Sequence, residues 1–95
     1  MKDAISRLST WYERQCVDDW HEDHGLKIGT LDNPGWSIFI DLNGTSLQER
    51  PYEGVKIDRT DNDWLVTRRN EAVFEAFGGP MNLNEMIEAF LNWAD

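Results

Sequence analysis

The residues best equipped for chemistry lie close together in one short segment. Six of them carry carboxylate or imidazole groups: Asp18, Asp19, His21, Glu22, Asp23 and His24. Such side chains could offer oxygen and nitrogen ligands to a divalent metal. Zinc proteases place two histidines four residues apart around a glutamate, whereas His21 and His24 are three apart and near a predicted helix end. We therefore expect no metal, no cofactor and no catalytic residue. The alternative is a small metal- or carboxylate-dependent enzyme that uses the His21/His24 acidic cluster.

Three other patterns that can serve catalysis have structural explanations. Cys16 lies on the apolar stripe of a predicted helix with carboxylates after it, and this setting disfavours a reactive thiolate and favours a buried structural cysteine. Gly78-Gly79-Pro80 lacks the lysine and the serine or threonine of a phosphate-binding loop. Carboxylates are so numerous that chance pairs are expected, and no Ser-His-Asp order accompanies them. The residues therefore favour a protein that is not an enzyme.

The candidate residues follow a predicted amphipathic helix over Ala4 to Trp20. Its large residues recur at helical spacing within an arc of about 120°, and they are Ile5, Leu8, Tyr12, Cys16 and Trp20. Trp11 lies off this stripe, so both a core and a surface position stay open for it. The helix should end near Asp23 to Gly25, because glycine readily adopts the left-handed conformation that closes many helices.

Alternating side chains then predict strands. Five are expected: Leu26 to Leu31, Trp36 to Leu42, Tyr52 to Arg59, Trp64 to Arg69 and Ala72 to Phe77. The segment Asp32-Asn33-Pro34-Gly35 predicts the turn of a β-hairpin, because Pro34 presets its own φ and Gly35 accepts a positive φ.

A second amphipathic helix is predicted near the C-terminus. Asn82 and Glu85 approximate a capping box, and one side of the helix then carries Leu83, Met86, Ile87, Phe90, Leu91, Trp93 and Ala94. We assign Trp64 and Trp93 to the core. The pattern predicts an α+β fold, an antiparallel β-sheet meander of about five strands with an N-terminal and a C-terminal helix packed on it. Its 95 residues fit a single domain, residues 1–95.

Charge and composition narrow the range of partners. Eighteen acidic residues against nine Lys and Arg give a net charge of −9, which argues against direct nucleic-acid binding and against anionic membranes. No apolar run approaches the ~20 residues of a membrane span. One cysteine cannot form an internal disulfide, and no apolar stretch of signal length follows Met1. We expect a soluble, cytoplasmic protein.

Several short motifs, in a fixed order from Trp11 to Ala94, resemble a known family. They are W-Y-E-R-Q-C at Trp11 to Cys16, D-W at Asp19-Trp20, T-L-D-N-P-G-W at Thr30 to Trp36, I-D-L at Ile40 to Leu42, D-W at Asp63-Trp64, F-G-G-P-x-N-L at Phe77 to Leu83 and F-L-x-W-A at Phe90 to Ala94. In this combination the chain is similar to the immunity protein 53 family of bacterial polymorphic toxin systems. The resemblance implies a non-catalytic protein that binds and neutralises a cognate toxin.

The clustered acids suggest how such binding would work. A nuclease-type toxin needs a basic cleft for phosphate, which an acidic surface with aromatic anchors can occupy, with faster association through electrostatic steering. The candidate toxin-binding residues are Asp18, Asp19, Trp20, Glu22, Asp23, Asp32, Asn33 and Trp36. Solvated acidic faces are common, and Trp20 and Trp36 also match the core side of their own elements. A homo-oligomeric adaptor is a further alternative, and the sequence leaves the oligomeric state open.

Overall fold

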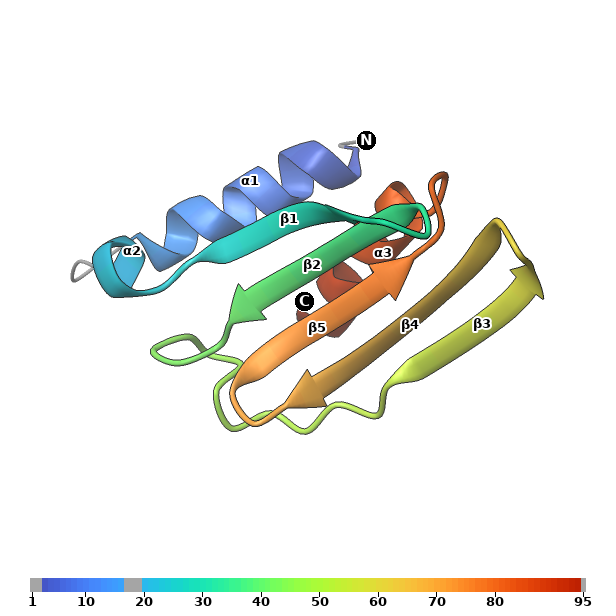
Figure 1. Cartoon of the computed structure of the whole chain (residues 1–95). Helices are drawn as coiled ribbons and strands as arrows, with labels where there is room; N and C mark the ends of the chain where they lie inside the picture. Colours follow the sequence, from blue (N-terminus) through green and yellow to red (C-terminus); the bar gives the residue numbers. More distant parts are fainter. Residues whose placement is uncertain (1–2, 17–19, 95) are drawn as a thin grey trace.

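Helices and strands follow one another through the described residues, 3–16 and 20–94 of a computed structural model (Figure 1). In chain order these elements are α1 (Ala4–Gln15), α2 (Trp20–Asp23), β1 (Leu26–Leu31), β2 (Gly35–Asp41), β3 (Val55–Thr60), β4 (Asp63–Asn70), β5 (Val73–Gly78) and α3 (Leu83–Ala94). The predicted strands are confirmed to within a residue, except that β3 begins three residues later than expected. Tyr52 instead turns its ring onto Phe74 and Trp93.

The five strands form one antiparallel sheet in the order β1-β2-β5-β4-β3. The predicted α+β fold with an N-terminal and a C-terminal helix is confirmed. The strand order departs from a simple meander at one connection, because β5 lies between β2 and β4 (Figure 1). The chain leaves β2 through a long segment, residues 42–54, and enters the sheet again at its far edge.

Arg69 holds that long segment in place. Its Nη1 donates to the carbonyls of Leu47, at 2.8 Å, and of Arg50, at 2.5 Å, and its Nη2 donates to the carbonyl of Gln48. Leu47 is fully buried, so the segment contributes to the core as well as connecting β2 to β3. Three backbone carbonyls of this segment thus receive a charged donor.

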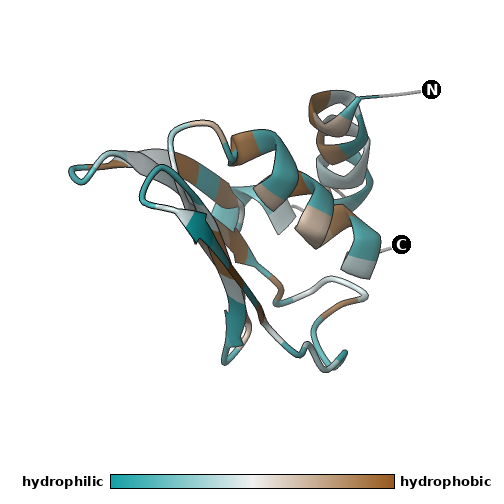
Figure 2. Ribbon diagram, turned by 90° about the vertical axis from the view of Figure 1, so that its right-hand side faces the viewer, coloured by the Kyte–Doolittle hydropathy of each residue, from teal (hydrophilic) through white to brown (hydrophobic). Residues whose placement is uncertain are grey.

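The long helices α1 and α3 pack on one face of the sheet, as Figure 2 shows. Alternate residues of β2 and β5 form the sheet side of the core, and residues of α3 pack against them. The fully or almost fully buried apolar residues there are Ile38, Ile40, Phe74, Ala76, Met86, Ile87, Phe90 and Leu91. Gly78 lets α3 approach, since a Cβ there would lie 2.6 Å from the Met86 sulfur.

The first helix differs from its prediction in length and in orientation. It ends at Gln15, and Trp20 begins the separate short helix α2. Its buried residues are Ala4, Leu8 and Trp11, whereas Ile5 and Tyr12 are exposed and Cys16 is half-buried. The buried stripe therefore follows the spacing i, i+4, i+7 and centres on Trp11, whose indole packs edge-on against Phe90 at 5.0 Å.

The predicted hairpin turn is present, but not for the predicted reason. Gly35 is not among the glycines with positive φ in the described residues. It is required because a Cβ there would lie 2.2 Å from the carbonyl oxygen of Gly78 on the neighbouring strand β5. Close packing of two backbones, rather than turn geometry, accounts for this glycine.

Candidate functional site

The structure separates the predicted toxin-binding residues into two groups at opposite ends of β1. Trp20, Glu22 and Asp23 belong to α2, which precedes the strand, and Asp32, Asn33 and Trp36 belong to the hairpin that follows it. The six residues of β1 span roughly 20 Å at the usual rise per residue. Asp18 and Asp19 lie outside the described residues.

Within α2, the tryptophan and the acids have different environments. Trp20 is 6% exposed, and its Nε1 donates to the carbonyl of Asn43 at 2.6 Å. Gly44, with φ of 78°, lies beneath this indole, where a Cβ would come within 3.0 Å of the ring. The core interpretation of Trp20 is thus confirmed. Glu22 and Asp23 are exposed, so α2 buries an indole and presents two carboxylates.

His24 connects α2 to the end of β2. Its Nδ1 lies 2.6 Å from Oδ2 of Asp41, while Oδ1 of Asp41 accepts the backbone N–H of Asn43 at 2.9 Å. The alternative enzyme hypothesis placed a metal or an acid–base pair on the His21/His24 acidic cluster. Across residues 3–16 and 20–94, no group of three or more His, Cys, Asp or Glu side chains could hold a metal ion. The pair ties the end of β2 to the segment that follows α2.

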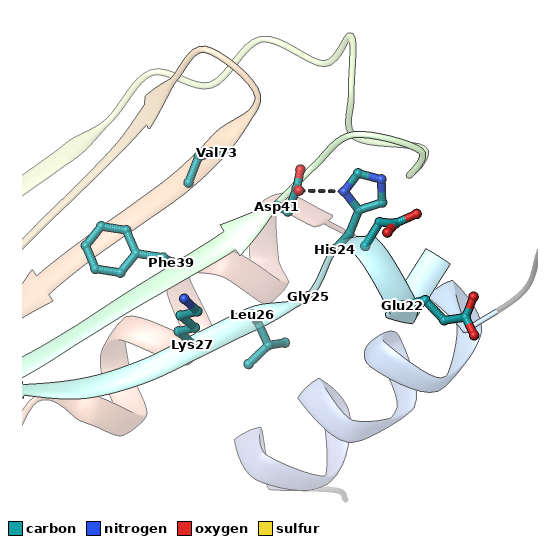
Figure 3. Close-up of a pocket in the computed structure, with 9 residues that line it drawn as sticks. Glu22, His24, Gly25, Leu26, Lys27, Phe39, Asp41 and Val73 are labelled. Atoms are coloured by element: carbon teal, nitrogen blue, oxygen red, sulfur yellow. Dashed lines mark hydrogen bonds and ion pairs between the residues drawn. The ribbon is translucent and has the colours of Figure 1, made fainter. Parts of the chain in front are cut away.

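An open hollow of about 660 Å³ lies beside the His24–Asp41 pair (Figure 3). Its lining residues come from α2, the link from α2 to β1, and the strands β1, β2 and β5; they are Glu22, Asp23, His24, Gly25, Leu26, Lys27, Phe39, Asp41 and Val73. Three carboxylates therefore line the hollow against one ammonium group and the imidazole. Phe39 and Val73 give it an apolar side, so it can receive a side chain that is both long and cationic.

At the other end of β1, the hairpin is exposed at its tip and anchored at its base. Asp32 and Asn33 are exposed. Trp36 is half-buried against the core, and its Nε1 donates to the carbonyl of Pro80 at 2.9 Å. This bond joins the hairpin to the connection before α3, which favours the core interpretation of Trp36.

Sequence reasoning missed an apolar surface on the face of the sheet that the long helices leave uncovered. Strand alternation places half-buried or exposed apolar side chains there, and four of them, on β2, β4 and β5, are Phe39, Val66, Val73 and Phe77. We call these four residues the outer apolar patch. Trp64, which we expected in the core, is half-buried and alternates with the buried Leu65, so it belongs to the same outer face. The sequence did carry a signal for this face, because Phe39 lies between Ile38 and Ile40 and strand alternation therefore places it on the opposite side of the sheet.

A charged network fastens the start of α3 to the far edge of the sheet. Arg59 bonds Glu85 and Asp63, each at 2.8 Å, and the buried Asn82 donates to both carboxylates. Arg59 and then Asn82 lower the pKa of Glu85, while Asn82 and then Arg59 lower the pKa of Asp63. These bonds account for the residues as structural ties.

The fold is that of a small α+β protein with one sheet face that the long helices leave uncovered. None of the helices in the described part of the chain is long and apolar enough to span a membrane. The family model of immunity protein 53 matches residues 5–95. The chain therefore belongs to the immunity protein 53 family. No curated protein and no solved structure matches the chain. Immunity proteins are generally non-enzymatic, and the family implies a toxin as the binding partner.

Proposed function

We propose that this chain neutralises the cognate toxin of a bacterial polymorphic toxin system by forming a stoichiometric complex with it in the cytoplasm of the cell that makes both. The observation that carries the proposal is the family match over residues 5–95. The chain acts as a shaped counterpart to another protein, and no bond is made or broken.

The toxin that fits best is one that acts on nucleic acid. Such an enzyme needs a basic cleft for phosphate, and a chain with a net charge of −9 is its electrostatic complement. Glu22, Asp23 and Asp32 are exposed, as a steering surface requires. One standard interface buries roughly 800 Å² per partner, so a single toxin can touch both ends of β1. Asp18, Asp19, Asn33 and the flanking Trp20 and Trp36 stay within the proposed contact region.

Coexpression tests the proposal directly. The chain is produced together with the toxin encoded beside its gene, and the two are copurified while growth of the host is followed. We expect a one-to-one complex and restored growth. Copurification without rescue, or rescue without a complex, would overturn neutralisation by binding. A matched immunity protein from an unrelated family serves as the control for specificity.

Association with the toxin should slow as salt is added. The Debye length falls from about 10 Å at 0.1 M to about 3 Å at 1 M salt, so the long-range attraction between opposite charges fades. Stopped-flow fluorescence of the tryptophans measures the association rate. We expect a steep decline of the association rate between these concentrations and a much smaller change in the dissociation rate. Equal association rates across the range would remove steering from the mechanism.

A further inference from the structure

We infer that the toxin docks on the uncovered face of the sheet, over the outer apolar patch, and inserts an arginine or lysine side chain into the hollow beside His24 and Asp41. This inference rests on the proposed function, because it names the surface and the side-chain chemistry of that same partner. It shares Glu22 and Asp23 with the contact region predicted from the sequence, but its apolar part, the outer apolar patch, was not in that prediction.

The outer apolar patch is continuous across the sheet. Phe39 on β2 lies diagonally from Phe77 on β5, and their ring centroids are 5.7 Å apart in an edge-to-face arrangement. Val66 on β4 pairs directly with Phe77. Val73 on β5 pairs with Asp41, which places it diagonally from Phe39. Phe39 is 37% exposed. In the described residues no helix covers this face, so these side chains meet water in the free protein (Figure 2). Exposed aromatic residues of this kind are typical of the centre of a protein interface.

The hollow connects the outer apolar patch to charged side chains. It shares Phe39 and Val73 with the patch, and Glu22 and Asp23 line it from α2. Figure 3 shows Phe39, Lys27 and Val73 rising from three neighbouring strands beside the Asp41–His24 pair. A partner side chain that enters here passes an apolar side and reaches a place where carboxylates outnumber the single ammonium group. Arginine and lysine meet both conditions, since an aliphatic stem precedes their charge.

The same face already holds one guanidinium in this manner. Arg68 lies over the Phe77 ring, 5.4 Å from its centroid, and its Nε is 2.6 Å from Oε1 of Glu75. Glu75 and Phe77 are separated by one residue on β5, and Phe39 and Asp41 have the same separation on β2. Each pair presents an aromatic ring and a carboxylate on the uncovered face. The β5 pair binds an arginine of this chain. On β2, both oxygens of Asp41 are already bonded, by His24 and by the Asn43 N–H, so Phe39 supplies the ring while Glu22 and Asp23 supply the carboxylates for a cationic side chain of the toxin.

Binding of the purified neighbouring toxin to matched variants tests the surface. Phe39→Ala should weaken the complex at least about thirtyfold, as expected for a central anchor, and the double variant Glu22→Lys/Asp23→Lys at least about tenfold. The controls are Tyr12→Ala, an aromatic of similar exposure on α1, and Glu88→Lys, an exposed acid on α3. Both controls should bind within about twofold of the natural chain. Isothermal titration calorimetry gives the affinities, and circular dichroism verifies that each variant is folded.

Failure of the docking surface and failure of the proposed function give different outcomes. If the natural chain binds and neutralises the toxin while Phe39→Ala and the double lysine variant bind equally well, the docking surface is wrong and the function stands. If the controls weaken binding as much as the test variants, the surface is also wrong. Failure of the natural chain to bind the toxin would instead overturn the proposed function.

A second measurement needs no toxin. N-acetylarginine amide is titrated into the natural chain and followed by amide chemical shifts, with N-acetylcitrulline amide as the uncharged analogue. We expect saturable shifts at Lys27, Phe39 and Val73 with arginine only, and their loss in the Glu22→Lys/Asp23→Lys variant. Equal responses to both amides, or none, would overturn the cation-accepting role of the hollow.

Discussion

The two faces of the sheet use the same strands for different purposes. On β2, Ile38 and Ile40 are buried beneath the long helices, while Phe39 between them is 37% exposed on the opposite face. On β5, Phe74 and Ala76 are fully buried, and Phe77 on the opposite face is only half-buried. One strand therefore carries both stability and a surface for recognition, and a shift by one residue exchanges the two.

Neighbouring charged side chains on β4 also lie on opposite faces of the sheet. Arg68 and Arg69 are neighbours on β4, yet Arg68 lies on the outer face with Glu75 and Phe77, whereas Arg69 bonds three carbonyls of the segment 42–54. On the uncovered face, Arg68 pairs with Glu75 and still keeps 58% of its side chain exposed. A charge on the covered face is committed to the fold.

The largest expected effect contrasts two phenylalanines on adjacent strands. Phe74→Ala removes a fully buried ring and leaves a cavity, so the free energy of unfolding should fall by about 3–5 kcal/mol. Phe39→Ala removes only a partly exposed cross-strand contact and should cost under about 1 kcal/mol. Urea unfolding followed by tryptophan fluorescence measures both. Similar losses for the two variants would contradict the division between the faces.

A smaller contrast is expected between the adjacent arginines. Arg69→Ala should lower the free energy of unfolding by about 2–3 kcal/mol, because three carbonyls lose a charged donor. Arg68→Ala should cost less, about 1–2 kcal/mol, because Arg68 itself is 58% exposed, while Glu75, 11% exposed, loses its charged partner and keeps the Asn70 amide. The same urea titrations apply. A larger loss for Arg68→Ala than for Arg69→Ala would mean that the outer face also stabilises the fold.

Local patterns in the sequence were sufficient for the elements and most of the core. Alternation located the strands, and helical spacing found the buried side of α3, because each signal depends only on near neighbours along the chain. These local patterns could not predict that β5 lies between β2 and β4 in the sheet. Alternation tells which face a residue occupies, but not which strand lies beside it.

The same limit explains the error on α1 and the features of the candidate site that the sequence did not reveal. Ile5, Tyr12 and Trp11 could all fit an apolar stripe, and only packing against Phe90 decides in favour of Trp11. His24 and Asp41 are 17 residues apart and meet only when β1 and β2 pair. Periodicity could place Phe39 on the second face, but whether another layer covers that face depends on where both long helices pack.

The last and smallest effect concerns how the covering helix is attached, and it appears in acid. The folded state holds the pKa values of Asp63 and Glu85 below their ordinary values of 3.8 and 4.5. A lowered pKa in the folded state contributes stability above the ordinary pKa, and that contribution disappears as the pH falls through the lowered value. Stability from these carboxylates should therefore be constant from pH 6 to 8 and decline below about pH 5.

In Arg59→Gln this decline should be shallower, because Arg59 is the leading cause of the lowered pKa of Glu85 and the second cause of that of Asp63. Asp3, whose pKa is lowered by the Ser6 N–H at the start of α1, should keep its own acid dependence in that variant. Urea midpoints between pH 3 and pH 6 measure the slopes, with Asp3→Asn as the matched comparison. An unchanged slope in Arg59→Gln would show that the helix over the covered face is held by packing alone.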